Sequence, residues 1–211
     1  MGTEHYFTAR PASANERQSI SVTLAGHTVK VETAGGVFSS SRLDLGTAVL
    51  LDKAPLPPLS GNFLDLGCGW GPIALTLALL APAATVWAVD VNERALELTA
   101  LNARNLGLSN IRTCLASEIP PDLRFDLIWS NPPIRIGKSE LHTLLLHWLG
   151  KLADNGEAYL VVQRNLGADS LADWLRTQLP APTWQITKAA SAKGYRILDV
   201  VFSPHTANPN T

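Results

Sequence analysis

The chain has 211 residues and a formal net charge of −1, from 17 basic and 18 acidic side chains. Apolar residues make up 46% of it, which is enough apolar surface to exclude a disordered or collagen-like chain. The near-zero charge excludes a surface that is basic throughout, so a nucleic-acid partner would need a local basic patch. Two cysteines suit a reducing cytosol, and no Cys/His cluster predicts a metal site.

The start of the chain shows no basic segment followed by an apolar run, so we expect no secretory signal. The most apolar stretch, residues 73–89, is broken by Pro82 and is too short to span a bilayer. We therefore expect a cytoplasmic protein that has no membrane partner.

Residues 1–60 are expected to form an N-terminal extension that packs on the main domain. Ile20–Leu24 and His27–Val31 alternate between apolar and polar residues, and Ala25-Gly26 between them predicts a β-hairpin. Leu43 to Leu51 then shows a short apolar helical pattern. An extension of this size is too small to fold alone.

From residue 61 onward, apolar strand patterns alternate with helical patterns, which is typical of a mostly parallel sheet covered by helices. The expected strands are 63–66, 85–89, 111–115, 125–129, 158–162, 185–188 and 196–202, and the expected helices are 72–80, 93–105, 141–152 and 171–179. The last two strands are joined by a short turn at 191–194, so they must be antiparallel. We predict an α/β three-layer sandwich over residues 61–203, with a seven-stranded sheet, followed by a polar tail at 204–211.

A glycine-rich loop, Asp65-Leu-Gly67-Cys-Gly69-Trp-Gly71-Pro72, follows the first expected strand and opens a helix. Glycines let the backbone approach a ligand closely. The spacing G-x-G-x-G-P departs from the dinucleotide fingerprint G-x-G-x-x-G. A carboxylate at Asp65 would repel a pyrophosphate and attract a ligand that bears ammonium and sulfonium groups. These features favour S-adenosylmethionine.

Acidic residues also follow the next two strands. Asp90 ends the second strand and can accept hydrogen bonds from both hydroxyls of a ribose. Its alternative role is to cap the following helix, although Asn92 already suits that position. Glu118 follows the third strand, where it is placed either to accept from an adenine amine or to be a solvated loop acid.

Asn131-Pro132-Pro133 comes directly after the fourth strand. The two prolines stiffen the loop and leave its carbonyls free to accept. The side-chain oxygen of Asn131 and the carbonyl of Pro132 can therefore hold both N–H bonds of a planar amine and aim its nitrogen at an electrophile. The alternative is an ordinary Asn-Pro turn.

Together these motifs resemble those of the class I S-adenosylmethionine-dependent methyltransferases. The resemblance implies a Rossmann-like fold and methyl transfer to an amine, because Asn-Pro-Pro marks methylation of adenine N6, guanine N2 or glutamine N5 in this class. The fourth position of that motif is usually Tyr or Phe, whereas this chain has Ile134. Stacking on the target must therefore be weaker or come from another side chain.

Further segments are similar to the RsmC-like methyltransferases, which act on guanine N2 of small-subunit ribosomal RNA. They are 5–7, 35–39, 43–47, 131–138 and 193–198, so that the match covers nearly the whole chain except the tail. The resemblance implies a cofactor site made of Asp65, Gly67, Cys68, Gly69, Gly71, Asp90, Val91, Ser117, Glu118 and Asn131, with Phe38 and Thr47 lying over it. It implies a catalytic motif of Asn131, Pro132 and Pro133, and guanine N2 of 16S ribosomal RNA as the acceptor.

Five basic residues, Arg135, Lys138, Lys188, Lys193 and Arg196, are candidates for a patch that binds the phosphates of ribosomal RNA or of the small subunit. Their alternative role is ordinary solvated surface.

Tyr6, Phe7 and Phe38 either stack on a base or pack in the apolar interior.

Three rival functions stay open: a methyltransferase for a protein glutamine or small-molecule amine, a nicotinamide-dependent oxidoreductase, and a nucleotide-binding module without catalysis.

Overall fold

The computed structural model describes residues 16–204 of the chain. Tyr6 and Phe7, the 5–7 segment and residues 205–211 of the polar tail lie outside the described residues. None of the helices within 16–204 is long and apolar enough to cross a membrane.

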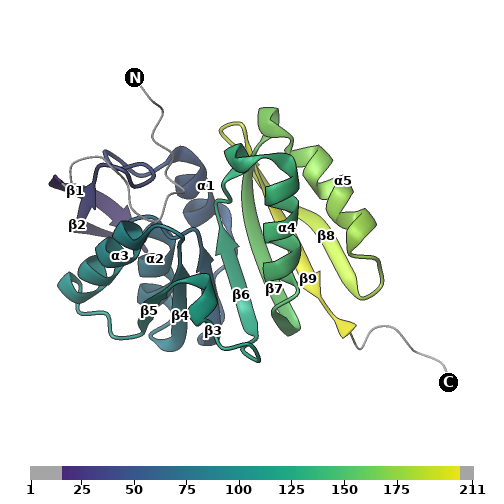
Figure 1. Ribbon diagram of the computed structural model, residues 1–211, viewed down its shortest axis with the longest axis horizontal. Helices are drawn as coiled ribbons and strands as arrows, with labels where there is room; N and C mark the ends of the chain where they lie inside the picture. The colour runs from purple at the N-terminus through teal and green to yellow at the C-terminus, as the bar shows by residue number, and fades with distance from the viewer. Residues whose placement is uncertain (1–15, 205–211) are drawn as a thin grey trace.

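A seven-stranded sheet forms the centre of the molecule, with strand order β5-β4-β3-β6-β7-β9-β8 (Figure 1). The strands are β3 (Ser60–Leu66), β4 (Ala83–Val89), β5 (Ile111–Cys114), β6 (Phe125–Ser130), β7 (Leu152–Gln163), β8 (Trp184–Ala192) and β9 (Tyr195–Phe202). The strands from β5 to β7 in this order are parallel, and β9 is antiparallel to both of its neighbours. The predicted mostly parallel sheet with an antiparallel last strand is confirmed.

Helices cover both faces of this sheet, as a parallel sheet requires. The helices are α1 (Leu45–Lys53), α2 (Pro72–Leu80), α3 (Glu93–Asn105), α4 (Lys138–Leu149) and α5 (Ala168–Gln178), with short 3₁₀ turns η1 (Ala116–Glu118), η2 (Ile134–Ile136) and η3 (Arg164–Leu166). Residues of α4 and α5 pack with Phe125 and Ile128 on one face. Residues of α1 and α2 pack with Phe63 and Leu127 on the other face (Figure 1).

The N-terminal extension contains the predicted hairpin, formed by β1 (Arg17–Leu24) and β2 (His27–Ala34). Its two-residue turn, Ala25-Gly26, has φ angles of 49° and 80°, the left-handed geometry that suits the twist of a hairpin. The apolar side of the hairpin shares a buried cluster with Trp70 and with Leu98 of α3. The hairpin is therefore anchored beside the glycine loop.

The topology brings four segments to one edge of the sheet. Strands β5, β4, β3 and β6 are neighbours and parallel, so their carboxyl ends meet at the same edge. The segments that follow them, in that spatial order, are 116–118, 90–91, 67–71 and 131–133. The chain reverses its direction of winding at β3, and ligands of open α/β sheets bind at such a point.

Candidate active site

The glycine loop after β3 is fixed between β4 and α3. The amides of Gly67 and Cys68 both donate to the carbonyl of Val89, at 2.8 and 3.1 Å. Gly71 has φ 97°, and a Cβ added there would lie 2.9 Å from the side chain of Thr99. Only glycine suits this position, because any side chain would collide with α3.

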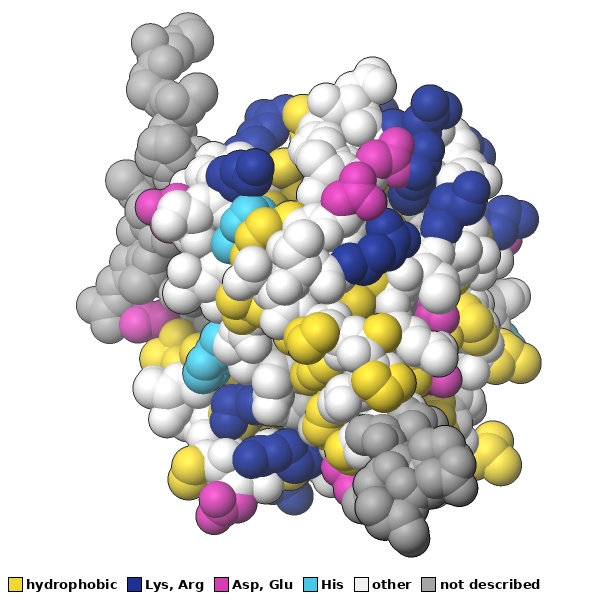
Figure 2. All heavy atoms as spheres, turned by 90° about the vertical axis from the view of Figure 1, so that its right-hand side faces the viewer, with side chains coloured by type: hydrophobic (Ala, Val, Ile, Leu, Met, Phe, Trp, Pro, Cys, Tyr) yellow, Lys and Arg dark blue, Asp and Glu magenta, His cyan; other side chains and the backbone are white. Residues whose placement is uncertain are grey.

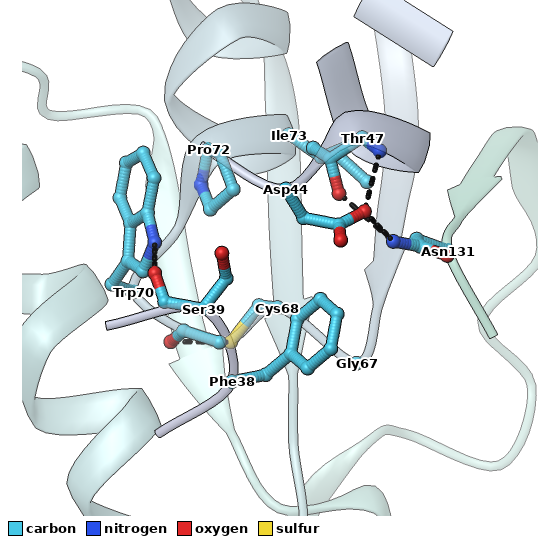
Figure 3. A pocket seen from close by; sticks show the side chains of 11 residues that line it. Phe38, Ser39, Asp44, Thr47, Gly67, Cys68, Trp70, Pro72, Ile73 and Asn131 are labelled. Carbon is cyan, nitrogen blue, oxygen red and sulfur yellow. Dashed lines mark hydrogen bonds between the residues drawn. The ribbon is translucent and has the colours of Figure 1, made fainter. Parts of the chain in front are cut away.

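The backbone at Gly67 faces an open hollow. Gly67 is exposed with φ 80°, and a Cβ added there would meet nothing within 4 Å. The hollow beside it is shallow and holds about 340 Å³ when its open mouth is included. Its lining comprises Phe38, Ser39, Asp44, Thr47, Gly67, Cys68, Gly69, Trp70, Pro72, Ile73 and Asn131 (Figure 3). Among the described residues, this lining includes a carboxylate and no Lys, Arg or His, which suits a cationic ligand better than a pyrophosphate.

Residues 35–44, here named the covering loop, connect β2 to α1 over this edge of the sheet. The indole nitrogen of Trp70 donates to the carbonyl of Ser39 at 3.3 Å. The side-chain nitrogen of Asn92 donates to the carbonyl of Gly36 at 2.8 Å, and the guanidinium of Arg94 donates to the carbonyl of Gly35 at 2.6 Å. The covering loop is therefore tied to both the glycine loop and α3.

Asp65 lies beneath the glycine loop and does not line the hollow. Its side chain is fully buried, and Oδ2 accepts from the amide of Ala74 at 2.9 Å. Oδ1 is buried and has no hydrogen-bond partner within the described residues 16–204. Burial raises the pKa of Asp65 to about 8; the amide of Ala74 counteracts this rise, and the charge of Asp90 adds to it. Asp65 therefore holds a proton at neutral pH unless a positive charge comes near it.

Asp90 lies directly after β4 and accepts hydrogen bonds from the glycine loop and from the start of α3. One carboxylate oxygen accepts from the amide of Gly69 at 3.0 Å, and the other accepts from the amide of Asn92 at 2.9 Å. Burial raises the pKa of Asp90, and the amides of Gly69 and Asn92 counteract that rise. Asn92 itself caps α3 by accepting from Arg94, as predicted. Neither Asp90 nor its exposed neighbour Val91 lines the hollow.

The segment after β5 lies further along the same edge. Ser117 and Glu118 are exposed on η1. A carboxylate oxygen of Glu118 accepts from the amide of Leu115 at 2.6 Å. Ser117 and Glu118 are not part of the hollow's lining, so the structure brings them to the site edge without joining them to the hollow.

Asn131 meets two residues of the N-terminal extension. Its amide nitrogen donates to Asp44 Oδ2 at 2.9 Å and to Thr47 Oγ1 at 3.0 Å (Figure 3). A carboxylate can only accept, so the nitrogen of Asn131 must face Asp44 and its Oδ1 must face away. The end of β6 is held to β3 by Ser130, whose hydroxyl donates to the carbonyl of Leu66 at 2.7 Å.

Asp44 is a site residue that the sequence pattern did not single out. Its local signal is the pattern Asp-x-x-Thr at the start of α1, where Asp44 Oδ2 accepts from the amide of Thr47 at 3.0 Å as an N-cap. That pattern predicts a cap and does not reveal a partner in β6 or beyond.

The two prolines do not leave their carbonyls free, so that expectation is wrong. The carbonyl of Pro132 accepts from the amide of Ile134 at 2.8 Å, and that of Pro133 accepts from Ile136 at 3.2 Å. Each carbonyl keeps a second lone pair for a ligand. Ile134 packs against the apolar cluster under α4 and does not line the hollow.

The basic residues divide into two groups. Arg135, Lys138, Lys188 and Lys193 are exposed, whereas Arg196 pairs with the carboxylate of Asp169 and is largely covered. Figure 2 shows Lys and Arg side chains gathered in the upper part of the face that forms the right-hand side of Figure 1. No group of three or more His, Cys, Asp or Glu suited to hold a metal occurs within the described part of the chain.

Comparison with known proteins shows which family this chain matches. The model of the methyltransferase small domain matches residues 28–199. The uncharacterized protein YbxB of Bacillus subtilis (strain 168) is 33% identical over 199 residues, which are 93% of this chain and 97% of that protein. Ribosomal RNA small subunit methyltransferase C of Aeromonas hydrophila is 38% identical over 123 residues, which are 57% of this chain and 34% of that enzyme.

Solved structures share the fold. The 16S rRNA N2 G1207 methyltransferase (RsmC) of T. thermophilus, in complex with AdoMet and guanosine, aligns with a TM-score of 0.74 at 22% identity, over 89% of this chain and 50% of that chain. The ribosomal protein L11 methylase of Lactobacillus delbrueckii aligns with a TM-score of 0.61 at 21% identity, over 81% of this chain and 84% of that chain. The chain thus spans about half of the first of these chains and about a third of the Aeromonas enzyme.

Proposed function

Because the chain belongs to the methyltransferase small domain family, it is an S-adenosylmethionine-dependent methyltransferase, and we propose that it methylates guanine N2 in small-subunit ribosomal RNA. One observation carries the amine chemistry: the amide of Asn131, oriented by Asp44 and Thr47, lies beside the hollow that the glycine loop borders. The choice of small-subunit ribosomal RNA is supported by the similarity to ribosomal RNA small subunit methyltransferase C, and the choice of guanine N2 rests on the resemblance to the RsmC-like group.

The proposal assigns each cofactor group a place along the edge of the sheet. Gly67, Cys68 and Gly69 take the methionine end, where the open backbone at Gly67 admits a close approach. Asp90 takes the ribose, and Ser117 and Glu118 take the adenine. Phe38 and Thr47 cover the site from the N-terminal side; both line the hollow. Bound S-adenosylmethionine supplies an electrophilic methyl group.

Asn131 and Pro132 orient the acceptor amine. The lone pair of an exocyclic amine is delocalised into the base, so that the nitrogen is a weak nucleophile. In the proposal, Asn131 Oδ1 accepts one N–H bond, and the second lone pair of the Pro132 carbonyl accepts the other. Two acceptors in fixed positions favour reaction by orientation and stabilise the positive charge that develops on the nitrogen.

The RNA backbone is proposed to meet the four exposed basic residues Arg135, Lys138, Lys188 and Lys193. Such contacts neutralise phosphates and add affinity that depends on salt. Arg196 is left out of this role, because its guanidinium is already paired with Asp169.

The test is methyl transfer from labelled S-adenosylmethionine to naked 16S RNA and to assembled small subunits, followed by mass analysis of the nucleosides. The expected product is N2-methylguanosine. N6-methyladenosine, or label in a protein glutamine, would contradict the proposed acceptor.

Asn131→Ala is the matched variant for this test. It removes the acceptor oxygen, so turnover is expected to fall at least about a hundredfold. The affinity for S-adenosylmethionine, measured by calorimetry, should stay within a few fold, because the glycine loop is untouched. Wild-type turnover in Asn131→Ala would remove the proposed role of Asn131.

A further inference from the structure

We propose that Asp44 is a positioning residue, whose carboxylate holds the amide of Asn131 with its oxygen available to the incoming amine. The N-terminal extension would then complete the acceptor site and not only cover the cofactor. This inference rests on the proposed function, because it takes an amine as the acceptor.

The hydrogen bonds around Asn131 allow only one orientation of its amide. The two ends of a side-chain amide are nearly the same size, so hydrogen bonds decide which end faces which way. In the observed orientation the nitrogen donates to Asp44 Oδ2 at 2.9 Å and to Thr47 Oγ1 at 3.0 Å. A flipped amide would place its oxygen against the carboxylate oxygen and lose the charge-assisted bond.

Asp44 is itself held in place, so it can act as a fixed reference. Its Oδ2 also accepts from the amide of Thr47, which is buried at the start of α1. The next residue but one, Gly46, is packed so tightly that an added Cβ would lie 2.8 Å from the ring of Tyr195. Burial, and secondly the charge of Asp44, raise the pKa of Tyr195, which is consistent with this close packing.

Removal of the Asp44 carboxylate has a defined chemical effect. Without it, the amide of Asn131 can turn and present its N–H groups to the amine. Two donors then face each other, and no acceptor remains on Asn131 to orient the amine. Methyl transfer should slow although all residues of the Asn-Pro-Pro motif are intact.

Two variants separate this role from helix capping. Asp44→Ser keeps a good N-cap for α1, but its shorter side chain does not reach Asn131. Asp44→Asn keeps the length, and its amide oxygen can accept from both Thr47 and Asn131. Positioning therefore predicts a larger defect for Asp44→Ser than for Asp44→Asn, whereas capping alone predicts similar behaviour of the two variants.

The first measurement needs no substrate. In ¹H–¹⁵N spectra of the full chain, the side-chain amide signals of Asn131 are assigned by their absence in Asn131→Asp. We expect these signals to shift in Asp44→Ser and to exchange faster with water. Signals that are unchanged in Asp44→Ser would overturn the proposal, whatever the acceptor proves to be.

The second measurement is single-turnover methyl transfer to assembled small subunits at saturating cofactor and RNA. Asp44→Ser should slow it by about tenfold to a hundredfold, with the thermal midpoint nearly unchanged. Because Asp44 also lines the hollow, the dissociation constant of S-adenosylmethionine is measured for each variant and the cofactor is kept saturating. Asp44→Asn should recover much of that rate. Equal rates in wild type and Asp44→Ser, or equally slow rates in both variants, would overturn the proposal. If the wild-type protein methylates no RNA, the proposed function fails, and the spectra still test the orientation of the amide.

Discussion

Gly67 is the residue whose missing side chain we expect to matter most for the cofactor. A methyl group at Gly67 would project into the open space beside the loop, where the proposed ligand approaches the backbone. Gly107, just past α3, has a similar φ of 70° and equally open surroundings. Gly67→Ala and Gly107→Ala should therefore lose similar stability, about 1 kcal/mol each from the left-handed backbone.

Only Gly67→Ala should weaken binding of S-adenosylmethionine, by about tenfold, the equivalent of about 1.4 kcal/mol. Calorimetric titration of both variants measures this difference. Equal affinities in the two variants would show that the cofactor does not approach the backbone at Gly67.

Asp65 gives the stability of the protein a characteristic dependence on pH. Its pKa in the folded chain is about 8, whereas an unfolded aspartate has a pKa of about 3.9. Between these values the folded state binds one more proton than the unfolded state. The free energy of unfolding should therefore fall as pH rises from about 4 to 8, by up to about 1.4 kcal/mol per pH unit from this group.

Asp65→Asn should remove that contribution, because an amide does not titrate and its oxygen can still accept from Ala74. Urea unfolding of both proteins without cofactor, at intervals between about pH 5 and 8, gives the two slopes. Parallel slopes would mean that Asp65 is ionised in the folded protein.

Single residues differ in how far their hydrogen-bond partners can be predicted from the sequence. Asn92 was recognisable as a cap because its partner is two residues away. Asp44 was not recognisable as a partner of Asn131, because 87 residues separate them and only the folded sheet brings them together. The hydrogen bond to the carbonyl of Pro132 is not predictable from the sequence, because it depends on the conformation of η2, which no local pattern indicates.

At the level of elements, Asn102 joins the hairpin to the main domain. It is fully buried on α3; its oxygen accepts from the amide of Glu32 at 2.7 Å, and its nitrogen donates to the carbonyls of Glu32 and Trp70, both at 2.9 Å. Asn102→Ala leaves three backbone groups without these partners: the half-buried amide and carbonyl of Glu32 and the buried carbonyl of Trp70. We expect a decrease of about 2–4 kcal/mol in the free energy of unfolding.

Asn105→Ala, on the exposed side of the same helix, is the control and should change stability by less than about 0.5 kcal/mol. Hydrogen exchange should show faster opening of β2 and the covering loop in Asn102→Ala alone. Unchanged exchange in β2 would mean that apolar packing, and not Asn102, holds the hairpin.

Elements were predictable where their ends carry local signals. The helix at Pro72–Leu80 has the predicted bounds because Gly71 and Pro72 mark its start. The strand β7 begins at Leu152, six residues earlier than predicted. The turn-like Asp154-Asn155-Gly156 is an irregularity within β7: Asn155 has a left-handed φ of 61°, and the register with β6 shifts between Phe125 and Leu127. The helix α4 begins at Lys138, where a polar first turn adds nothing to the apolar periodicity.

At the scale of the whole molecule, we expect RNA binding to depend on where the basic side chains lie and not on the net charge. Lys138→Gln and Lys193→Gln remove two exposed charges of the proposed RNA face. RNA binding should weaken, and the slope of log affinity against log salt should decrease by about 0.7 to 0.9 for each phosphate that is no longer neutralised. Lys30→Gln, on the exposed side of the hairpin, should leave the slope unchanged. Filter binding over a range of salt concentrations measures all three variants, and equal slopes would place the RNA elsewhere.

The architecture was largely predictable, because alternating strand and helix patterns imply a parallel sheet whose carboxyl ends share one edge. The same pattern alone brings the segments at 67–71, 90–91, 116–118 and 131–133 together. The sequence did not reveal which strands are neighbours, since the insertion of β9 between β7 and β8 depends on packing between distant segments. It also did not reveal that the covering loop reaches Asn131.

The bridge between Asp44 and Asn131 constrains how this gene can diverge. A mutation at either position alone disturbs a partner encoded 87 codons away. The residues at the two positions are therefore expected to change together. Chimaeras that exchange about the first 50 residues between distant relatives should inherit a working catalyst only when both parents carry matching residues at these two sites.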